Sequence, residues 1–312
     1  MKTLVVASGK GGTGKTTFTA VFAYLAAHMS PVGQTTVLAD SDVEGSNLPL
    51  ALGAGAESSE DFLGSEKAVL DTELCQHCGL CADSCRFGAL SLSDEGRPIF
   101  DEWSCEGCGS CAAACPEDAI RFERRAAGKL MTGGSCAGPM VFAQLRPAED
   151  LSGKLVTQVC GRARQLAGQQ RAELVLVDGP PGVGCPAIAS LTNADALLAV
   201  AEPSSSGVHD LRRLLALARQ LELPVRVVLN KADLFGPGAQ HLREACQDDA
   251  VEVIGEVPFD DELPAVLEHL CEDGGADLST AGWCPGLRAL ADVWQEVARW
   301  LGSVPARAYA GA

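Results

Sequence analysis

The chain has 312 residues, enough for one large α/β domain with a sizeable core and a small inserted module. Asp and Glu outnumber Lys and Arg by 41 to 24, for a formal net charge of -17, and basic runs are absent. This balance argues against nonspecific nucleic-acid binding, which depends on basic side chains that neutralise phosphates. No apolar run reaches about 18 residues, and residues 1–7 resemble a strand rather than a signal peptide. We therefore expect a cytoplasmic protein without stable membrane insertion, whose 14 cysteines indicate metal or redox sites.

A glycine-rich segment lies between the first predicted strand and the first predicted helix. The apolar run 4–7 precedes it, and an Ala-rich helical pattern covers residues 18–28. This order is typical of a phosphate-binding loop, because glycines let backbone N–H groups approach phosphate oxygens and the helix adds unpaired N–H groups. The residues predicted to bind the nucleotide are Gly9, Lys10, Gly11, Gly12, Thr13, Gly14, Lys15, Thr16 and Thr17. Lys15 is expected on the β- and γ-phosphates and Thr16 on Mg²⁺; the alternative is a glycine turn without a ligand.

Two acidic residues follow the second predicted strand, residues 35–39. Asp40 and Asp42 come just past its carboxyl end, where open parallel sheets bind their ligands. We expect Asp40 to be an outer-shell partner of Mg²⁺ or of the loop. Ordinary turn chemistry or a helix N-cap is the alternative for either residue.

Eight cysteines then form two copies of one spacing. Each copy reads Cys-x2-Cys-x2-Cys-x3-Cys, and the copies begin at Cys75 and Cys105. In bacterial-type ferredoxins three closely spaced cysteines ligate one [4Fe-4S] cluster, while the fourth ligates the other cluster. That rule predicts one cluster on Cys75, Cys78, Cys81 and Cys115, and a second on Cys105, Cys108, Cys111 and Cys85. Two zinc sites are the alternative, because CxxC pairs also bind zinc.

The cysteine segment is predicted to be an inserted domain over residues 70–123. Its two copies continue into the similar triplets 88–90 and 118–120, which indicates an internal duplication. Arg86 departs from the pattern, because Pro116 follows the fourth cysteine of the second copy, but no ligand is lost. The module is too small to bury much apolar surface, so the clusters are expected to provide much of its stability.

The α/β pattern resumes after the insert. Residues 133–139 are predicted to be a flexible loop and 153–166 a helix. The apolar strand 174–177 ends in Asp178, which is expected to hold Mg²⁺ through water, and the N–H of Gly182 is expected to approach the γ-phosphate.

Three further strands are predicted at 196–201, 225–229 and 251–254, followed by an apolar-striped final helix over 287–301. Strands that alternate with helices imply a parallel sheet with right-handed crossovers. The predicted fold is therefore an α/β P-loop NTPase with a mostly parallel sheet flanked by helices, plus a small α+β ferredoxin-like insert. Cys246, Cys271 and Cys284 show no paired spacing and are interpreted as small buried apolar residues.

The run 10–17, K-G-G-T-G-K-T-T, resembles the deviant Walker A box of the MinD, ParA and Mrp class of ATPases, which includes the nitrogenase iron protein. The resemblance implies a nucleotide-sandwich dimer in which Lys10 reaches the partner's phosphates, and in which Asp42 positions the attacking water. It also implies that Asn230 contacts adenine and that Pro258 lies beside the base. Because Asp233 fits a guanine reader equally well, ATP rather than GTP rests on this resemblance.

Cys185 lies seven residues after Asp178, the distance at which a cysteine of the nitrogenase iron protein ligates a dimer-bridging [4Fe-4S] cluster. The resemblance makes Cys185 a candidate ligand of a third, shared cluster or a contact for the insert. Such a site needs a second cysteine from each subunit, for which Cys136 is the better candidate and Cys160 the weaker. The alternative is that Cys185 is a small buried residue.

Our leading hypothesis is an ATP-hydrolysing redox protein with an ATPase domain at 1–69 and 124–312 and a ferredoxin domain at 70–123. Its expected cofactors are ATP, Mg²⁺ and two [4Fe-4S] clusters. Its expected partners are a second copy or a related ATPase, and a redox or iron-sulfur client protein. An iron-sulfur carrier of the Mrp type is the alternative, although that branch uses a carboxyl-side C-x-x-C pair that is absent here. A positioning ATPase of the MinD or ParA type is disfavoured by the acidity, and similar chains labelled cobyrinic acid a,c-diamide synthase share only the nucleotide fold.

Overall fold

The computed structural model describes residues 1–29, 35–147, 149, 151–269, 271 and 283–307. The chain divides into two compact units. The first comprises residues 1–60, 130–144 and 152–312, and the second comprises residues 61–129 and 145–151. The functional division at residues 70 and 123 remains a prediction.

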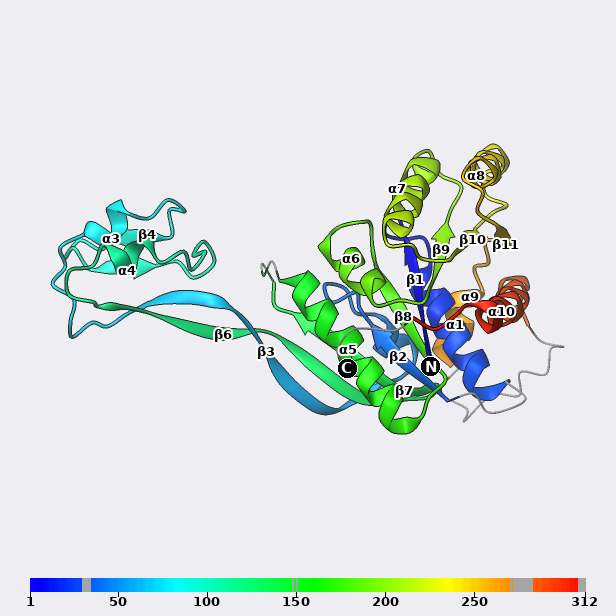
Figure 1. Cartoon of the computed structure of the whole chain (residues 1–312), viewed down its shortest axis with the longest axis horizontal. Coiled ribbons are helices and arrows are strands. Elements are labelled where there is room, and N and C mark those ends of the chain that lie inside the picture. Colours follow the sequence, from blue (N-terminus) through cyan, green and yellow to red (C-terminus); the bar gives the residue numbers. More distant parts are fainter. Residues whose placement is uncertain (30–34, 148, 150, 270, 272–282, 308–312) are drawn as a thin grey trace. The chain divides into compact units, whose positions relative to one another are not determined.

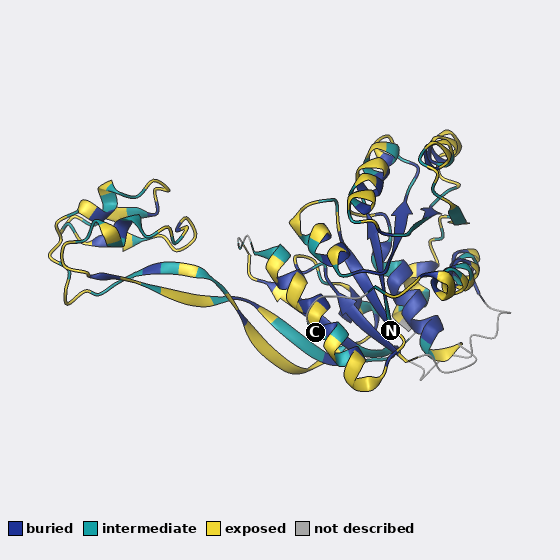
Figure 2. Ribbon diagram, viewed as in Figure 1, coloured by how far each residue is buried: buried dark blue, intermediate teal, exposed yellow. Residues whose placement is uncertain are grey.

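The first unit is built on a large, mostly parallel sheet (Figure 1). Its strands β11, β10, β9, β1, β8, β2 and β7 lie in that order, followed by β6 and β3. Their bounds are β1 Lys2–Ser8, β2 Thr36–Asp40, β7 Gly138–Leu145, β8 Leu174–Pro181, β9 Ala196–Ala201, β10 Val225–Asn230 and β11 Val253–Val257. The central strands are buried along most of their length, as Figure 2 shows, because helices cover both faces of a parallel sheet. This explains why their sequences are continuous apolar runs.

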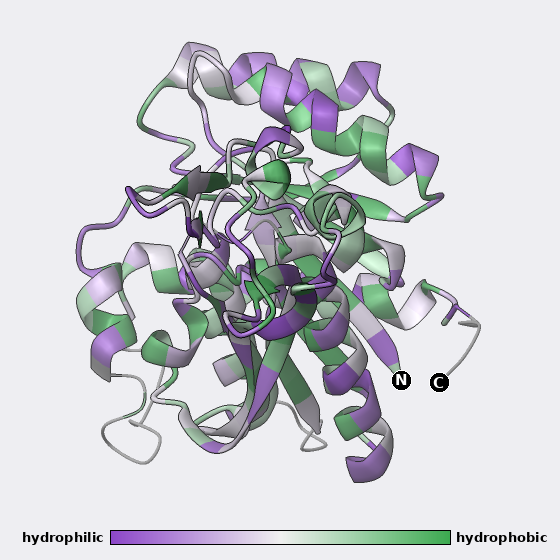
Figure 3. Ribbon diagram, turned by 90° about the vertical axis from the view of Figure 1, so that its left-hand side faces the viewer, coloured by the Kyte–Doolittle hydropathy of each residue, from purple (hydrophilic) through white to green (hydrophobic). Residues whose placement is uncertain are grey.

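Helices pack on both faces of this sheet. On one face, Phe18 and Phe22 of α1 (Lys15–His28) form a cluster with Trp294 and Val297 of α10 (Pro285–Ser303). α5 (Ser152–Gln170) packs on β2 and β8, and α7 (Gly207–Gln220) on β9 and β1. The remaining helices of this unit are α2 (Leu48–Ala51), α6 (Cys185–Thr192), α8 (Gly236–Asp248) and α9 (Leu263–His269). Hydrophilic and hydrophobic residues alternate along the surface helices, as expected of amphipathic helices (Figure 3).

The prediction of a flexible loop over residues 133–139 is wrong. Those residues form the end of β6 (Ile120–Ser135), a two-residue turn and the start of β7. Gly138 supplies the backbone freedom for this reversal, with a φ of 127°. The sequence also did not predict β3 (Gly55–Leu70). Its first seven residues are exposed and carry no apolar alternation.

The second unit holds the two cysteine copies, and their backbones repeat as their sequences do. Besides parts of β3 and β6, it contains the short helices α3 (Leu80–Asp83) and α4 (Ser110–Ala113) and the antiparallel pair β4 (Leu90–Leu92) and β5 (Pro98–Phe100). Left-handed residues recur at equivalent positions of the two copies: His77 and Gly107, Gly79 and Gly109, Gly88 and Asp118. The internal duplication is therefore a property of the structure as well as of the sequence.

Within the described part of the chain, no helix is long and apolar enough to span a bilayer.

Candidate nucleotide and cysteine sites

The loop between β1 and α1 needs its glycines for two different reasons. Gly12 and Gly14 have φ values of 79° and 96°, which favour glycine. Gly9 needs space, because a Cβ there would lie 2.2 Å from the carbonyl oxygen of Asp210. Gly12 and Gly14 thus allow the loop to turn, and Gly9 allows it to pack closely against α7.

The same loop contains a buried polar atom that the protein does not use. Thr13 is only 2% exposed, and its hydroxyl has no hydrogen-bond partner among the described residues. Lys15, which opens α1, is 6% exposed. A buried orphan hydroxyl in the loop and a largely buried lysine at the start of the following helix suit an anion that accepts hydrogen bonds, so the residues present fit a nucleotide phosphate.

Asp40 and Asp178 are register neighbours on β2 and β8, and both are buried. Thr16 Oγ1 donates to Asp178 Oδ2 at 2.6 Å, and Thr19 Oγ1 donates to Asp178 Oδ1 at 3.2 Å. Burial, and then the charge of Asp40, raises the pKa of Asp178 to about 8. Two adjacent carboxyls and a threonine hydroxyl are the oxygen ligands and outer-shell partners that Mg²⁺ prefers.

Asp40 also shapes the loop that follows it. Its carboxylate accepts hydrogen bonds from the N–H of Asp42 at 3.0 Å, the Ser46 hydroxyl at 2.8 Å and the N–H of Leu48 at 3.0 Å. Burial raises its pKa to about 6. Asp40 therefore stabilises the turn that follows β2, which is the alternative role that the sequence left open for it.

Asp178→Asn is expected to stabilise the metal-free protein increasingly as pH rises from 5 to 8. Between an unfolded pKa of about 4 and the raised folded pKa, the folded wild type holds a proton that the unfolded chain releases. The wild type therefore loses unfolding free energy as pH rises through this range, whereas asparagine does not ionise. Thermal unfolding in EDTA across this range measures the effect, and a constant difference between the two proteins would contradict it.

Asp42 is half-buried on the same loop. Burial raises the pKa of Asp42, and the charge of Lys15 opposes that rise. The structure thus brings the predicted water-positioning carboxylate into the electrostatic range of the predicted phosphate-binding lysine.

Two predicted nucleotide contacts are engaged within the protein. The N–H of Gly182, which has a φ of 84°, donates to the carbonyl of Ser8 at 2.9 Å. Asn230 donates from Nδ2 to the carbonyl of Thr13 at 2.8 Å. Gly182 is thus bonded to the end of β1, and Asn230 is bonded to the phosphate loop. Pro258 is half-buried just after β11.

Lys10 has partners that sequence reasoning missed. Its Nζ lies 2.6 Å from Glu202 Oε1 and donates to Ser204 Oγ at 2.8 Å. Lys231 Nζ lies 3.0 Å from Glu202 Oε2. Glu202 follows β9 directly. Parallel sheets bind ligands past the carboxyl ends of their strands, so this position could have been singled out from the sequence.

The predicted crossover set of cysteines lines one cavity in the second unit. Cys85 of the first copy shares it with Cys105, Cys108 and Cys111 of the second, beside Phe87, Phe100 and Phe122. In the other set, Cys81 is buried and the Sγ of Cys115 accepts a hydrogen bond from the N–H of Ala119 at 3.4 Å. Across the residues described, no group of three or more His, Cys, Asp or Glu side chains converges on a single metal-ion position.

The three cysteines considered for a bridging cluster have different surroundings. Cys185 begins α6 and is exposed, so its alternative interpretation as a buried residue is wrong. Cys136 forms a disulfide with Cys271, with 5.5 Å between their Cα atoms, which corrects both its predicted role as companion ligand and the apolar interpretation of Cys271. Cys160 is buried, and burial raises its pKa to about 12, which disfavours the thiolate that a metal needs.

Cys185→Ser is therefore expected to leave the iron content per chain unchanged, because neither Cys136 nor Cys160 offers a free, exposed thiol as the second ligand. Iron and protein assays on anaerobically purified protein provide the measurement. A loss of about two irons per chain, or four per dimer, would instead show that Cys185 holds a shared cluster.

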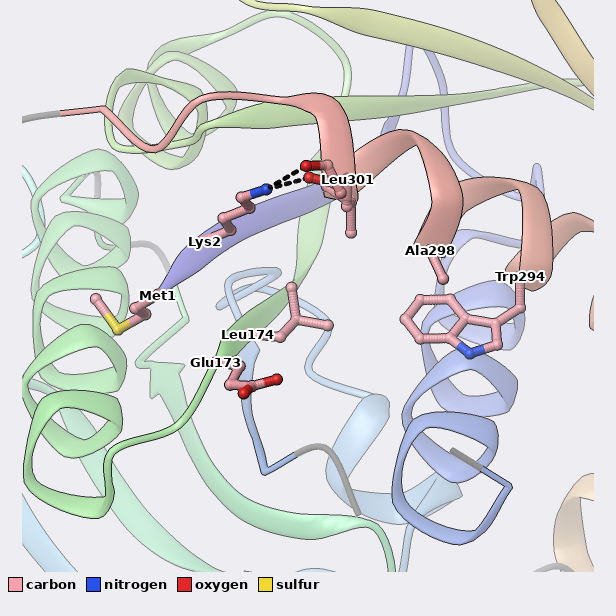
Figure 4. A pocket seen from close by; sticks show the side chains of 8 residues that line it. Met1, Lys2, Glu173, Leu174, Trp294, Ala298 and Leu301 are labelled. Atoms are coloured by element: carbon pink, nitrogen blue, oxygen red, sulfur yellow. Dashed lines mark hydrogen bonds between the residues drawn. The ribbon is translucent and has the colours of Figure 1, made fainter. Parts of the chain in front are cut away.

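A separate cavity of about 360 Å³ lies at the amino ends of β1 and β8, the edge opposite the phosphate loop (Figure 4). Trp294, Ala298 and Leu301 of α10 line it together with Lys2 and Glu173. Lys2 donates to the carbonyls of Leu301 and Gly302 at the end of α10, so its ammonium is already engaged. We assign this cavity no ligand.

The comparisons with known proteins agree with this geometry. Residues 4–270 match the family described as the CobQ/CobB/MinD/ParA nucleotide binding domain. An uncharacterized protein of Methanocaldococcus jannaschii, MJ0578, is 30% identical over 272 residues, covering 86% of this chain and 90% of that protein.

Solved structures share the fold. The septum site-determining protein MinD of Pyrococcus horikoshii, complexed with Mg-ADP, has 18% identity and a TM-score of 0.54, covering 96% of this chain and 97% of that one. A complex of ATP with an aspartate-to-alanine variant of Cyanothece McdA has 18% identity and a TM-score of 0.55, covering 100% of this chain and 99% of that one. With the matched family spanning most of its length, the chain belongs to the CobQ/CobB/MinD/ParA nucleotide-binding domain family.

Proposed function

We propose that this protein is an ATPase that binds two [4Fe-4S] clusters and couples nucleotide-switched dimerisation to electron transfer. The observation that carries the proposal is the combination of two sites in one chain. One is a phosphate loop with a buried orphan hydroxyl, and the other is a cavity lined by the four cysteines that the ferredoxin rule groups together.

On the nucleotide side, the N–H groups of the glycine loop, the Thr13 hydroxyl and the Lys15 ammonium would bind the phosphates. Thr16 and Asp178 would hold Mg²⁺, with Asp178 acting through water. Loss of the Asp178 proton would accompany metal binding, because its raised pKa describes the metal-free carboxyl. Asp42 would then orient the attacking water.

The base is expected to be adenine. Asp233 Oδ1 accepts the N–H of Phe259 at 2.7 Å. This bond uses one lone pair of the carboxylate, so adenine rather than guanine still rests on the resemblance to the MinD and ParA class. Asn230 and Pro258 remain the proposed contacts of the base.

On the cysteine side, the spacing of the ligands supports the proposal of a cluster. The ferredoxin rule groups Cys85 with Cys105, Cys108 and Cys111, and these four cysteines line one cavity of the second unit. Phe87, Phe100 and Phe122 line the same cavity, and in the other set the N–H of Ala119 donates to the Sγ of Cys115. Bound there, such clusters supply one-electron transfer.

The proposal includes the domain division at residues 69/70 and 123/124 and a cytoplasmic location. The proposed partners are a second copy or a related ATPase, and a redox client. Nucleic acid is not among them, because the chain carries a formal net charge of -17.

Electron delivery to an artificial acceptor tests the coupling. Anaerobically purified protein would be reduced, freed of reductant and mixed with methyl viologen or cytochrome c in the presence of Mg-ATP, Mg-ADP or no nucleotide. We expect the oxidation rate to change with Mg-ATP and the change to disappear in Lys15→Ala. Equal rates under all three conditions would refute the coupling, and net movement of iron to an apo-ferredoxin would favour the carrier alternative.

A further inference from the structure

The carboxylate of Glu202 joins Lys10 of the phosphate loop to Lys231, which follows β10. Oε1 lies 2.6 Å from Lys10 Nζ, and Oε2 lies 3.0 Å from Lys231 Nζ. The Glu202 side chain is 17% exposed. Each oxygen therefore serves one ammonium in a setting where charge-assisted hydrogen bonds are less screened than on open surface.

Each lysine also has a second contact in this network. Lys10 donates to Ser204 Oγ at 2.8 Å, and Lys231 donates to the carbonyl of Gly12 at 3.0 Å. One carboxylate thus connects the first half of the phosphate loop to the ends of β9 and β10.

The backbone around this network leaves little room for adjustment. A Cβ on Gly207 would lie 2.4 Å from the carbonyl oxygen of Glu202, and a Cβ on Gly9 would lie 2.2 Å from that of Asp210. The segment after β9 is therefore folded tightly on itself at Gly207, and the start of α7 packs closely on the phosphate loop at Gly9.

We propose that Glu202 is a positioning residue that retains Lys10 on its own chain until the phosphates of a nucleotide-bound second copy compete for it. This inference rests on the proposed function, in which Lys10 reaches across the dimer. A polyphosphate carries more negative charge than one carboxylate, so it can displace Glu202 once the second copy brings it within reach.

Lys231 makes that release energetically feasible. If Glu202 had Lys10 alone, departure of Lys10 would leave a half-buried carboxylate without a partner, which is costly. With Lys231 still bound to the other oxygen, the carboxylate stays paired after Lys10 leaves. Lys231 therefore makes it easier for Lys10 to leave Glu202.

Glu202→Gln is expected to strengthen ATP-dependent dimerisation, with half-dimerisation at about tenfold lower protein concentration, because retention of Lys10 restricts the competent fraction. Lys231→Met is expected to weaken it, since Glu202 then holds Lys10 as its only cation. Analytical ultracentrifugation with Mg-ATP measures both effects. Glu256→Gln is the matched control, because Glu256 pairs with Arg243 at 2.6 Å rather than with Lys10 or Lys231, and it should leave dimerisation unchanged.

The sign of the Glu202→Gln effect decides between retention and a merely structural role. A structural role predicts weaker or unchanged dimerisation, and either result would overturn the inference. The gain must also vanish in Lys10→Ala/Glu202→Gln, since it acts through Lys10. If the wild type binds ATP and dimerises but Glu202→Gln shows no gain, only this inference fails; if the wild type does not dimerise with ATP, the proposed function fails with it.

Discussion

Lys15→Ala is expected to lower ATP affinity by at least about 10²-fold, whereas Asp42→Ala should retain ATP affinity and lose about 10²-fold or more in turnover. Lys15 is 6% exposed at the start of α1, directly after the glycine loop, so water screens its charge only weakly. Asp42 is half-buried on the neighbouring loop, and it is expected to act on water rather than on phosphate. Isothermal titration gives the affinities, and phosphate release gives the turnover.

Two variants serve as controls for this pair. Lys129→Ala removes an exposed lysine of the second unit and should change neither quantity. Asp42→Asn keeps the shape of the side chain and should behave like Asp42→Ala, because the carboxylate charge is what orients water. An equal loss of ATP affinity in Lys15→Ala and Asp42→Ala would refute the separate roles.

The anaerobically purified protein is expected to contain about eight irons per chain, with visible absorbance that bleaches on reduction. Eight cysteines at the ferredoxin spacing provide the ligands, and the shared cavity of Cys85, Cys105, Cys108 and Cys111 indicates which belong together. Stoichiometric zinc in place of iron would overturn the ferredoxin interpretation and with it the redox function.

Double variants test the crossover directly. Cys85→Ser/Cys105→Ser removes two ligands of one predicted cluster and should retain about four irons, whereas Cys85→Ser/Cys75→Ser removes one ligand from each cluster and should retain far fewer. Without crossover the two results would be exchanged. Cys246→Ser, at a buried cysteine of α8, is the control and should retain about eight irons.

The sequence was informative where burial is uniform or where chemistry fixes the spacing. β1, β8 and β9 are buried on both faces, so they appear as apolar runs, and the glycine loop between β1 and α1 has a spacing that phosphate binding requires. β3 could not be predicted in this way, because its first seven residues are exposed and carry no apolar alternation.

Long-range contacts account for the remaining misses. The Cys136–Cys271 disulfide joins residues 135 positions apart, and no local spacing indicates such a pair. The contacts of Glu202 with Lys10 and Lys231 likewise depend on β1, β9 and β10 lying close together in the sheet. Side-chain partners of this kind become visible only after the strand order is known.

Redox titration of the reconstituted protein with and without Mg-ATP tests the central claim most directly. If nucleotide-driven dimerisation is coupled to electron transfer, the midpoint potential of at least one cluster should shift with Mg-ATP. The shift should be absent with Mg-ADP and in Lys15→Ala. Potentials that are identical in every nucleotide state, in protein that binds ATP and carries about eight irons, would contradict the account.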